Sequence, residues 1–383
     1  MSTATANWPT KALKEVAKID RNSVPPNKIK AGSLYVGLEN ITGEGQFDEV
    51  RKVVHGELAS NKFSFSPKHV LYGKLRPYLS KIARPDFAGI CSTDILPILA
   101  GHELDRDFLF HFLRRPEMVQ FATTRSTGAN LPRLSPIELA KFSVPIPKLE
   151  EQKRIAAILD KADSIRRDRV EAIEESKKLC PAIFHQMFRE VAGRLSGKHI
   201  ADKDSKLGCE LLGTGWKHTT LGKEITLQRG IDITKKEHVA GEVPVISSGG
   251  INGFHNKAAA KGPGVVLGRK GSVGSVHYID VDYWPHDTTL WVREFNGNIA
   301  RFVYEFFRQF PISKYEASTA NPSLNRNNLH PVNVWWPPVS EQQRFADYCE
   351  FFDKKLKLKL AKASQESDDL FNSLVQRAFR GEL

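Results

Sequence analysis

The sequence VPIPKLEEQKR at residues 144–154 has a counterpart in VWWPPVSEQQR at residues 334–344. In each block an apolar stretch ends at proline and is followed by Glu, Gln and Arg. Proline closes an extended segment, and acidic residues stabilise the first turn of a helix through the helix dipole. The two blocks therefore predict two equivalent points at which a strand gives way to a helix.

Two further pairs of segments recur in the same order and at nearly the same offset. Residues 126–130 (STGAN) are matched by residues 318–321 (STAN). Near the start of each half, Trp8 followed by Leu13 is matched by Trp216 followed by Leu221. Three ordered matches indicate an internal repeat, which predicts two similar domains.

A long amphipathic pattern follows each block, over residues 149–190 and 339–383. Spacings of three and four, kept up for about 40 residues, are typical of a coiled-coil seam. We expect two long helices that pair in antiparallel orientation; the alternative is two separate helices, each packed on its own domain. Pro181 should kink or interrupt the first helix near its end. The expected seam residues are Ile155, Ile158, Ala162, Ile165, Arg169, Ile173, Ser176, Cys180, Ile183 and Met187, and then Phe345, Tyr348, Phe352, Leu356, Leu360, Ala363, Ser367, Leu370, Leu374 and Ala378.

The remaining segments, residues 1–148 and 210–338, contain short apolar runs separated by Gly, Pro, Asn and Asp. Residues 69–73 (HVLYG) and 264–268 (GVVLG) are examples, and such runs predict short, buried strands. One helical stretch is expected in each segment, so each domain should be α+β. Residues 191–209 are polar and without periodicity, which indicates a linker.

The chain of 383 residues carries 56 Lys and Arg against 44 Asp and Glu, a net charge of +12. This excess points to a polyanion such as nucleic acid, although many soluble proteins are basic for solubility alone. The four cysteines share no CxxC spacing, and no apolar run approaches the ~18 residues of a membrane span. We expect a cytoplasmic protein that holds no metal and no cofactor.

Candidate DNA contacts lie in polar and basic turns. Residues 268–274 (GRKGSVG) place two cations between glycines that let a phosphate approach the backbone, and residues 73–76 (GKLR) carry two cations beside one glycine. The loops at 126–133 and 318–326 are rich in Arg, which can pair with guanine, and Asn, which can pair with adenine. The alternatives are ordinary hairpin turns and side chains that cap turns. The predicted DNA-contacting residues are Lys74, Arg76, Arg125, Asn130, Arg133, Arg229, Lys257, Arg269, Lys270, Ser272, Asn321 and Arg326.

Two α/β segments, each followed by a proline and Glu-Gln junction and a long helix, resemble the specificity subunits of type I restriction–modification systems. The best marks are PIPKLEEQKRI (145–155), GWKHTTLG (215–222) and GRKGSVG (268–274), and the resemblance covers essentially the whole chain. The chain departs from the pattern at Trp335, Trp336 and Phe345, where the first block carries smaller aliphatic residues.

The resemblance implies two α/β target-recognition domains in pseudo-two-fold repeat, separated by an antiparallel, coiled-coil-like pair of long helices. Each domain would bind half of an asymmetric bipartite DNA site. Two adenine-specific methyltransferase subunits and, for cleavage, ATP-dependent nuclease and translocase subunits are the implied partners. Methylation and cleavage would then belong to those partners.

The sequence itself offers no catalytic set. It lacks a GxxxxGK[ST] phosphate loop and any HExxH spacing. Residues 321–324 (NPSL) resemble the Asn-Pro-Pro-aromatic tetrapeptide of adenine methyltransferases but lack its second proline and its aromatic. We therefore expect a non-catalytic recognition subunit. The alternatives are an autonomous DNA-processing enzyme and a helical scaffold that binds only proteins.

Overall fold

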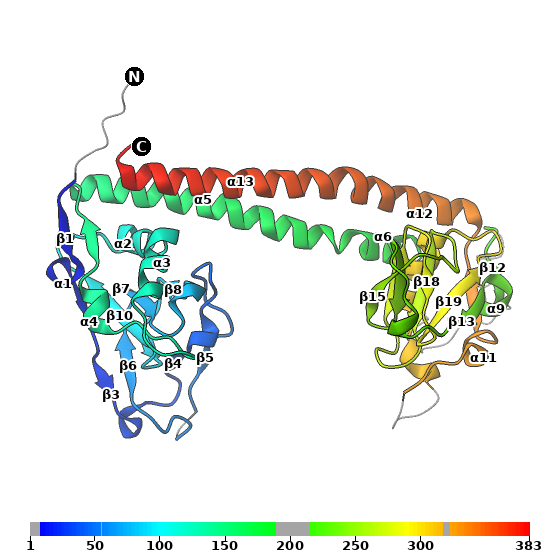
Figure 1. Ribbon diagram of the computed structural model, residues 1–383, viewed down its shortest axis with the longest axis horizontal. Coiled ribbons are helices and arrows are strands. Elements are labelled where there is room, and N and C mark those ends of the chain that lie inside the picture. Colours follow the sequence, from blue (N-terminus) through cyan, green and yellow to red (C-terminus); the bar gives the residue numbers. More distant parts are fainter. Residues whose placement is uncertain (1–7, 55, 189–213, 317–321) are drawn as a thin grey trace. The chain divides into compact units, whose positions relative to one another are not determined.

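The computed structural model describes residues 8–54, 56–188, 214–316 and 322–383 (Figure 1). The chain forms two compact units, unit 1 (residues 1–170 and 362–383) and unit 2 (residues 171–361). It passes between the units inside two helices, α5 (Leu149–Ser176) and α13 (Lys357–Arg380). Each unit thus includes one predicted domain together with parts of both long helices. The predicted linker at 191–209 lies outside the described residues.

Unit 1 is built on an antiparallel four-stranded sheet in the order β2-β10-β7-β8. All five residues of β7 are buried, as the apolar run at 69–73 predicts. Strand β1 pairs with β11, Thr10 opposite Pro145, so the start of the domain lies beside the strand that leads into α5. The elements are β1 (Thr10–Ala12), α1 (Leu13–Val16), β2 (Ala17–Ile19), β3 (Ser23–Val24), η1 (Pro26–Lys28), β4 (Leu34–Val36), η2 (Leu38–Asn40), β5 (Arg51–Lys52), β6 (Lys62–Phe65), β7 (His69–Gly73), η3 (Pro77–Leu79), β8 (Ile82–Ala83), β9 (Gly89–Cys91), β10 (Ile95–Ala100), α2 (Arg106–Leu113), α3 (Pro116–Thr124), α4 (Pro136–Ala140) and β11 (Ser143–Pro145).

Unit 2 repeats this frame with the order β13-β19-β16-β17, again antiparallel, and with β12 paired to β20. Strand β16 is buried at every residue, like β7. The repeat and the α+β class are therefore confirmed. The elements are α6 (Leu179–Met187), β12 (Lys217–Thr220), α9 (Leu221–Glu224), β13 (Thr226–Arg229), η4 (Lys235–Glu237), β14 (Val243–Ser247), β15 (Gly250–His255), β16 (Gly264–Gly268), β17 (Val276–Ile279), β18 (Trp284–Pro285), β19 (Thr289–Glu294), α10 (Ala300–Gln309), η5 (Ile312–Tyr315), α11 (Arg326–Leu329), β20 (Asn333–Trp336), α12 (Val339–Phe351) and η6 (Phe352–Leu356).

The second sheet of each unit differs. Unit 1 adds five strands in the order β3-β6-β9-β4-β5, whereas unit 2 adds three in the order β15-β14-β18. The frame is therefore common to both units, and the additions to it are not.

The long helices pair in antiparallel orientation within each unit. In unit 1, where α5 and α13 run side by side (Figure 1), the Arg154 side chain donates to the carbonyl of Leu383, and Arg169 donates to that of Ala363. In unit 2 the rings of Phe184 in α6 and Phe345 in α12 lie 5.5 Å apart. Antiparallel pairing, which the head-to-tail repeat predicts, is confirmed.

Ile155 lies in the core of unit 1 with Leu159, and the same core includes Val375 and Ala378 of α13. Ile158 and Ala162 line a groove shared with α13. A helix that packs on a domain and on a second helix needs two apolar faces, and the spacing of three and four combines both. Both alternatives from the sequence therefore hold at once.

Neither long helix is uniform. Helix α5 ends at Ser176 and α6 begins at Leu179, so Pro181 stands in the first turn of a new helix. Proline cannot donate to the preceding turn and clashes with its carbonyl, which explains a break just before it. In the second helix, α12 and α13 are joined by a π-helical turn, η6. Among the described residues, no helix is long and apolar enough to cross a membrane.

The Glu-Gln junctions hold each helix to its domain through a buried glutamine. Gln152 accepts a hydrogen bond from the amide of Asp105 at 2.8 Å and donates to the carbonyls of Glu103 and Pro147. Gln342 accepts from the amide of Ile299 at 3.0 Å and donates to the Asn298 side chain and the Pro337 carbonyl. Both glutamines are 0% exposed. The glutamine of each motif, with its three hydrogen bonds, therefore fixes the helix to its domain, and we call this arrangement the buried lock.

The aromatic residues of the second junction are accommodated in the core of unit 2. Trp336 is buried, and its indole N–H donates to Asn298 at 2.7 Å. Phe345 packs edge-on against Phe184 and Phe188. The departure at this junction thus belongs to a larger aromatic core in unit 2.

Candidate nucleic-acid interface

A turn and a loop meet in the same way in both units. In unit 1 the turn between β7 and β8 receives a hydrogen bond from Leu134 N to the Lys74 carbonyl, 2.9 Å long. In unit 2 the turn between β16 and β17 receives one from Leu324 N to the Arg269 carbonyl, 3.0 Å long. The matching bonds identify Lys74 with Arg269 as equivalent positions. Five predicted DNA contacts lie in these two turns: Lys74 and Arg76 in unit 1, and Arg269, Lys270 and Ser272 in unit 2.

Each turn contains two residues with left-handed backbone, but the residue types differ. Arg76 and Ser80 have φ angles of 51° and 50°, in the left-handed region. Gly271 and Gly274 of unit 2 have φ angles of 79° and 80°. Glycine adopts this conformation freely, whereas other residues pay a steric penalty of about 1–2 kcal/mol. Unit 1 therefore holds its turn under strain that unit 2 avoids.

All five residues predicted in the first domain come together at this turn. The loop from Thr127 to Arg133 is closed by two backbone hydrogen bonds of 3.0 and 2.8 Å, and Arg76 N donates to the Pro132 carbonyl at 2.7 Å. Asn130 lies within that loop and is exposed. The predicted residues gathered here are Lys74, Arg76, Arg125, Asn130 and Arg133.

Carboxylates hold some of these cations and leave others free. Asp94 lies 3.7 Å from the Lys74 amine and 3.4 Å from the Arg133 guanidinium. The Arg125 guanidinium stacks over the ring of Phe121 at 3.4 Å. Within the described part of the chain, the exposed side chain of Arg76 makes no hydrogen bond or ion pair. Arg76 is therefore fully available to a ligand.

In unit 2 the equivalent region is a polar pocket of about 610 Å³ that contains four arginines. Three of them were predicted from the sequence: Arg229, Arg269 and Arg326. The fourth, Arg293, was missed, because it lies just past four buried residues of β19 with no turn or glycine to mark it. Its guanidinium bonds the Gln228 side chain at 3.1 Å.

The pocket arginines differ in how firmly they are held. Arg229 pairs with the Asp287 carboxylate at 2.9 Å, and Arg269 donates to the Asp287 carbonyl at 3.4 Å. The side chain of Arg326 is exposed and has no hydrogen-bond or ion-pair partner among the described residues. Arg326 thus has the same freedom in unit 2 that Arg76 has in unit 1.

The other predicted residues of the second domain lie outside the pocket. Lys270 and Ser272 are exposed in the β16–β17 turn beside it. Lys257 is exposed in the segment after β15 and does not line the pocket. Asn321 lies outside the described residues, as does the whole of its STAN segment.

Two basic residues near the unit 1 turn bind groups of the protein itself. Lys81 donates to the Leu38 carbonyl at 2.6 Å. Arg84 forms two hydrogen bonds with Asp160 of α5, at 2.7 and 3.1 Å, and His111 contacts the same carboxylate at 2.7 Å. Burial alone would raise the pKa of Asp160, but these partners hold its pKa well below the usual range. This cluster attaches the first domain to α5.

Asp232, His286 and Asp287 are close enough to offer three ligand atoms to a cation. The Asp287 carboxylate, however, is already the partner of Arg229. A cation there would compete with the guanidinium, so we assign Asp287 to holding Arg229.

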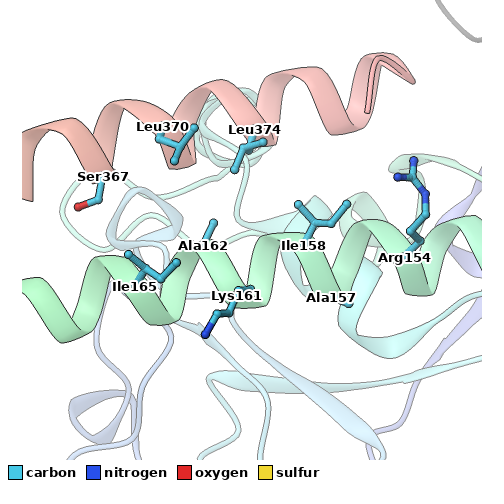
Figure 2. Close-up of a pocket in the computed structure, with 9 residues that line it drawn as sticks. All are labelled: Arg154, Ala157, Ile158, Lys161, Ala162, Ile165, Ser367, Leu370 and Leu374. Atoms are coloured by element: carbon cyan, nitrogen blue, oxygen red, sulfur yellow. The ribbon is translucent and has the colours of Figure 1, made fainter.

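A second feature is an apolar groove on the helix pair of unit 1, with a volume of about 460 Å³. Figure 2 shows Ile158, Ala162 and Ile165 of α5 on one side and Leu370 and Leu374 of α13 on the other. Ile165 and Leu370 are 38% and 57% exposed. Exposed apolar side chains gathered in a groove indicate a protein-binding surface.

The family model described as the type I restriction modification DNA specificity domain matches residues 5–175 and 215–365. The chain belongs to this family. A curated relative, the type I restriction enzyme EcoDI specificity subunit of Escherichia coli, is 27% identical over 212 residues, which cover 53% of this chain. The match takes in 46% of the relative, so the chain spans about half the length of the curated relative it matches.

Two solved structures share the fold of this specificity-domain chain. One comes from work on the complex assembly and conformational transition of the type I R-M system; it covers 100% of both chains with a TM-score of 0.67 and 20% identity. The other is a type I restriction-modification system S subunit from M. genitalium, with a TM-score of 0.54 and 15% identity. The match covers 99% of this chain and 98% of that one. The specificity-domain family is the one that the sequence motifs indicated.

Proposed function

We propose that this chain is the DNA-binding specificity subunit of a type I restriction–modification complex, and that each domain binds one half of an asymmetric bipartite site. The supporting observation is the shared turn-and-loop surface, which carries exposed cations in both units but not the same ones. A common scaffold with different contacts suits two modules that dock alike on DNA and recognise different bases. Since its ligand is DNA, we expect the subunit to act in the cytoplasm.

We propose two kinds of contact within this surface. Lys74 and Lys270 carry flexible amines on turns and suit phosphates, which give affinity without sequence information. Arg133, Arg326 and Asn130 have planar groups on loops and suit bidentate contacts to base edges. The predicted residues Arg76, Arg125, Arg229, Lys257, Arg269, Ser272 and Asn321 complete the interface.

We further propose that two methyltransferase subunits dock on the helix pair, and that nuclease and translocase subunits join the assembly for cleavage. The apolar groove of unit 1 gives one docking position. In unit 2, Tyr348 and Phe351 of α12 stand at the helical positions of Ile158 and Lys161, counted from the two junction glutamines, and are 46% and 54% exposed. The repeat thus supplies a second exposed apolar surface. Under this proposal catalysis belongs to the partners and the chain itself is non-catalytic.

The deciding experiment is an exchange of residues 210–338 for the matching segment of a relative, followed by mapping of methylated adenines in cells carrying the complete system. We expect one half-site to change and the other to stay. If both half-sites change together, the modular proposal is wrong.

A second measurement tests the electrostatic contribution. If each domain neutralises about three phosphates, the slope of log K against log salt should be roughly −5. Lys270→Ala should flatten this slope by about one unit and weaken binding to all sequences alike. A wild-type slope shallower than about −2 would contradict phosphate-dominated binding.

The rival enzyme function has a direct test. Purified chain incubated with DNA, AdoMet, Mg²⁺ and ATP should leave the DNA unmodified. Methylation or cleavage by the chain alone would favour an autonomous enzyme. The absence of salt-sensitive DNA binding, with or without methyltransferase, would favour a protein-only scaffold.

A further inference from the structure

The unit 1 surface carries large apolar side chains that the sequence reasoning did not single out. Tyr78 and Leu79 form the tip of the β7–β8 turn and are 51% and 41% exposed. Leu131, in the loop closed by Thr127 and Arg133, is 43% exposed. Exposed side chains contribute little to the core, so their place on the basic surface points to a ligand with apolar faces.

This tip is held in one conformation. Leu79 N donates to the Arg76 carbonyl and Ser80 N to that of Pro77, both at 2.9 Å, and Pro77 is buried. The left-handed residues Arg76 and Ser80 lie at its two ends. Backbone strain of this kind persists where surrounding structure enforces it, and it clusters at functional sites. The turn therefore presents Tyr78 and Leu79 as a rigid apolar edge.

The equivalent surface of unit 2 has the opposite chemistry. Its turn, residues 269–275, exposes Lys270 and Ser272 and keeps its one branched apolar residue, Val273, half-buried. The loop before α11 contributes Ser323 and Asn325 to the arginine pocket, and α11 itself contributes Asn327. Counted from the equivalent positions Lys74 and Arg269, Tyr78 and Leu79 correspond to the half-buried Val273 and Gly274. The arginines of unit 2 line the pocket beside this turn.

We propose that the two domains discriminate bases by different chemistry. The first domain recognises thymine C5-methyl groups in the major groove through Tyr78, Leu79 and Leu131. The second recognises guanine O6 and N7 acceptors through the pocket arginines, above all Arg326 and Arg293. Thymine alone among the bases presents a methyl group there, and guanine alone presents two acceptors in the geometry of a guanidinium fork. This inference rests on the proposed DNA-binding function.

The test uses duplexes of the site found by methylation mapping, with each half-site assigned by the domain exchange. Thymine is replaced by uracil, which removes only the methyl group, or guanine by 7-deazaguanine, which removes only the N7 acceptor. Each replacement is made in one half-site at a time, and binding of the full chain is measured. We expect uracil in the first half-site to weaken binding roughly fourfold for each methyl removed. Deazaguanine in the second should weaken it roughly 5- to 150-fold.

Matched variants assign the effects to residues. Tyr78→Ala, Leu79→Ala and Leu131→Ala together should abolish the uracil effect and leave the salt slope unchanged, whereas Arg76→Ala should flatten the slope and keep the uracil effect. Arg326→Ala with Arg293→Ala should abolish the deazaguanine effect. Equal responses of the two half-sites, or a uracil effect that survives loss of all three apolar side chains, would overturn the inference. These outcomes differ from the one expected if the proposed function is wrong. In that case methylation mapping would find no bipartite site.

Discussion

The two units of this chain agree in the frame that positions their surfaces and differ on the surfaces themselves. The four-stranded sheets have the same strand order, and Gln152 and Gln342 form the same buried lock. The turns after β7 and β16 both have a left-handed residue two positions after the equivalent Lys74 and Arg269, which is a strained Arg76 in one unit and Gly271 in the other. Buried hydrogen bonds tolerate little change, whereas an exposed turn can change its side chains at small cost. Under the proposed function, this contrast would let one scaffold recognise two different half-sites.

The largest expected effect is on the shared lock. In each variant, Gln152→Ala or Gln342→Ala, one buried backbone amide loses its acceptor and two oxygen atoms lose the hydrogen bond from the glutamine side chain. This loss should cost about 3 kcal/mol of local stability. Hydrogen exchange at the amides of Asp105 and Ile299 would measure it. The exposed neighbours Lys153→Ala and Gln343→Ala are controls. If only one glutamine matters, the two junctions are not equivalent.

A smaller effect should be confined to unit 1. Asp160→Asn breaks the pairing with Arg84 and His111, which should cost about 2 kcal/mol once the 37% exposure of Asp160 is considered. In unit 2 the same helical position holds Glu350, whose partner Lys354 lies on the same helix and is exposed. Glu350→Gln should therefore be close to neutral. Urea denaturation of both variants tests this contrast. Equal losses of stability in Asp160→Asn and Glu350→Gln would show that the two positions do not differ.

Substitutions at the left-handed positions of the two turns should change stability in opposite directions. Gly271→Ala places a Cβ in the left-handed region and should destabilise unit 2 by about 1 kcal/mol. Arg76→Gly relieves the same conformation in unit 1 and should raise stability by less than that, because glycine also loosens the unfolded chain. Thermal unfolding would compare both with Gly249→Ala, where no atom lies within 4 Å of the added Cβ and φ is not left-handed. A loss of stability in Arg76→Gly would contradict the assignment of backbone strain to Arg76.

The smallest effect concerns pH. His330 Nε2 accepts a hydrogen bond from Leu227 N at 3.0 Å, so the ring must be neutral. Burial, and then the nearby charge of Arg326, lower the pKa of His330. The unfolded chain therefore binds a proton more readily, and this contribution to stability is full above about pH 6.5 and is lost as the pH falls below it. His330→Gln keeps an acceptor without titrating and should weaken the pH dependence of unfolding; an unchanged profile would contradict this.

The sequence predicted the repeat, the α+β class, the antiparallel helices and the family, because each rests on spacing or on residue types with strong local preferences. The Glu-Gln blocks were explained only through the helix dipole, whereas the glutamine has the greater structural role. Its partners, Asp105 and Ile299, lie far away in the sequence, and no local pattern names them.

The candidate interface was predicted in part for the same reason. Glycines marked the β16–β17 turn and led to Arg269 and Lys270. Arg293 lies in the pocket because its strand, β19, pairs with β13, and its guanidinium donates to the Gln228 side chain. Tyr78 is distinguished only by its exposure. Pairing and exposure are properties of the folded chain, so these two residues could be found only in the structure.

The division of the chain between the units has a consequence for its synthesis. Phe379 of α13 packs in the core of unit 1, with its ring 5.1 Å from that of Phe108. Ribosomes add 5–20 residues per second, so the roughly 190 residues between the two parts of unit 1 take about 10 to 40 s to make. During that time the apolar face of α5 that will receive α13 has no partner from its own chain. A nascent specificity chain therefore exposes that face before its first unit can close, and any helix that reaches it earlier competes with its own C-terminal helix.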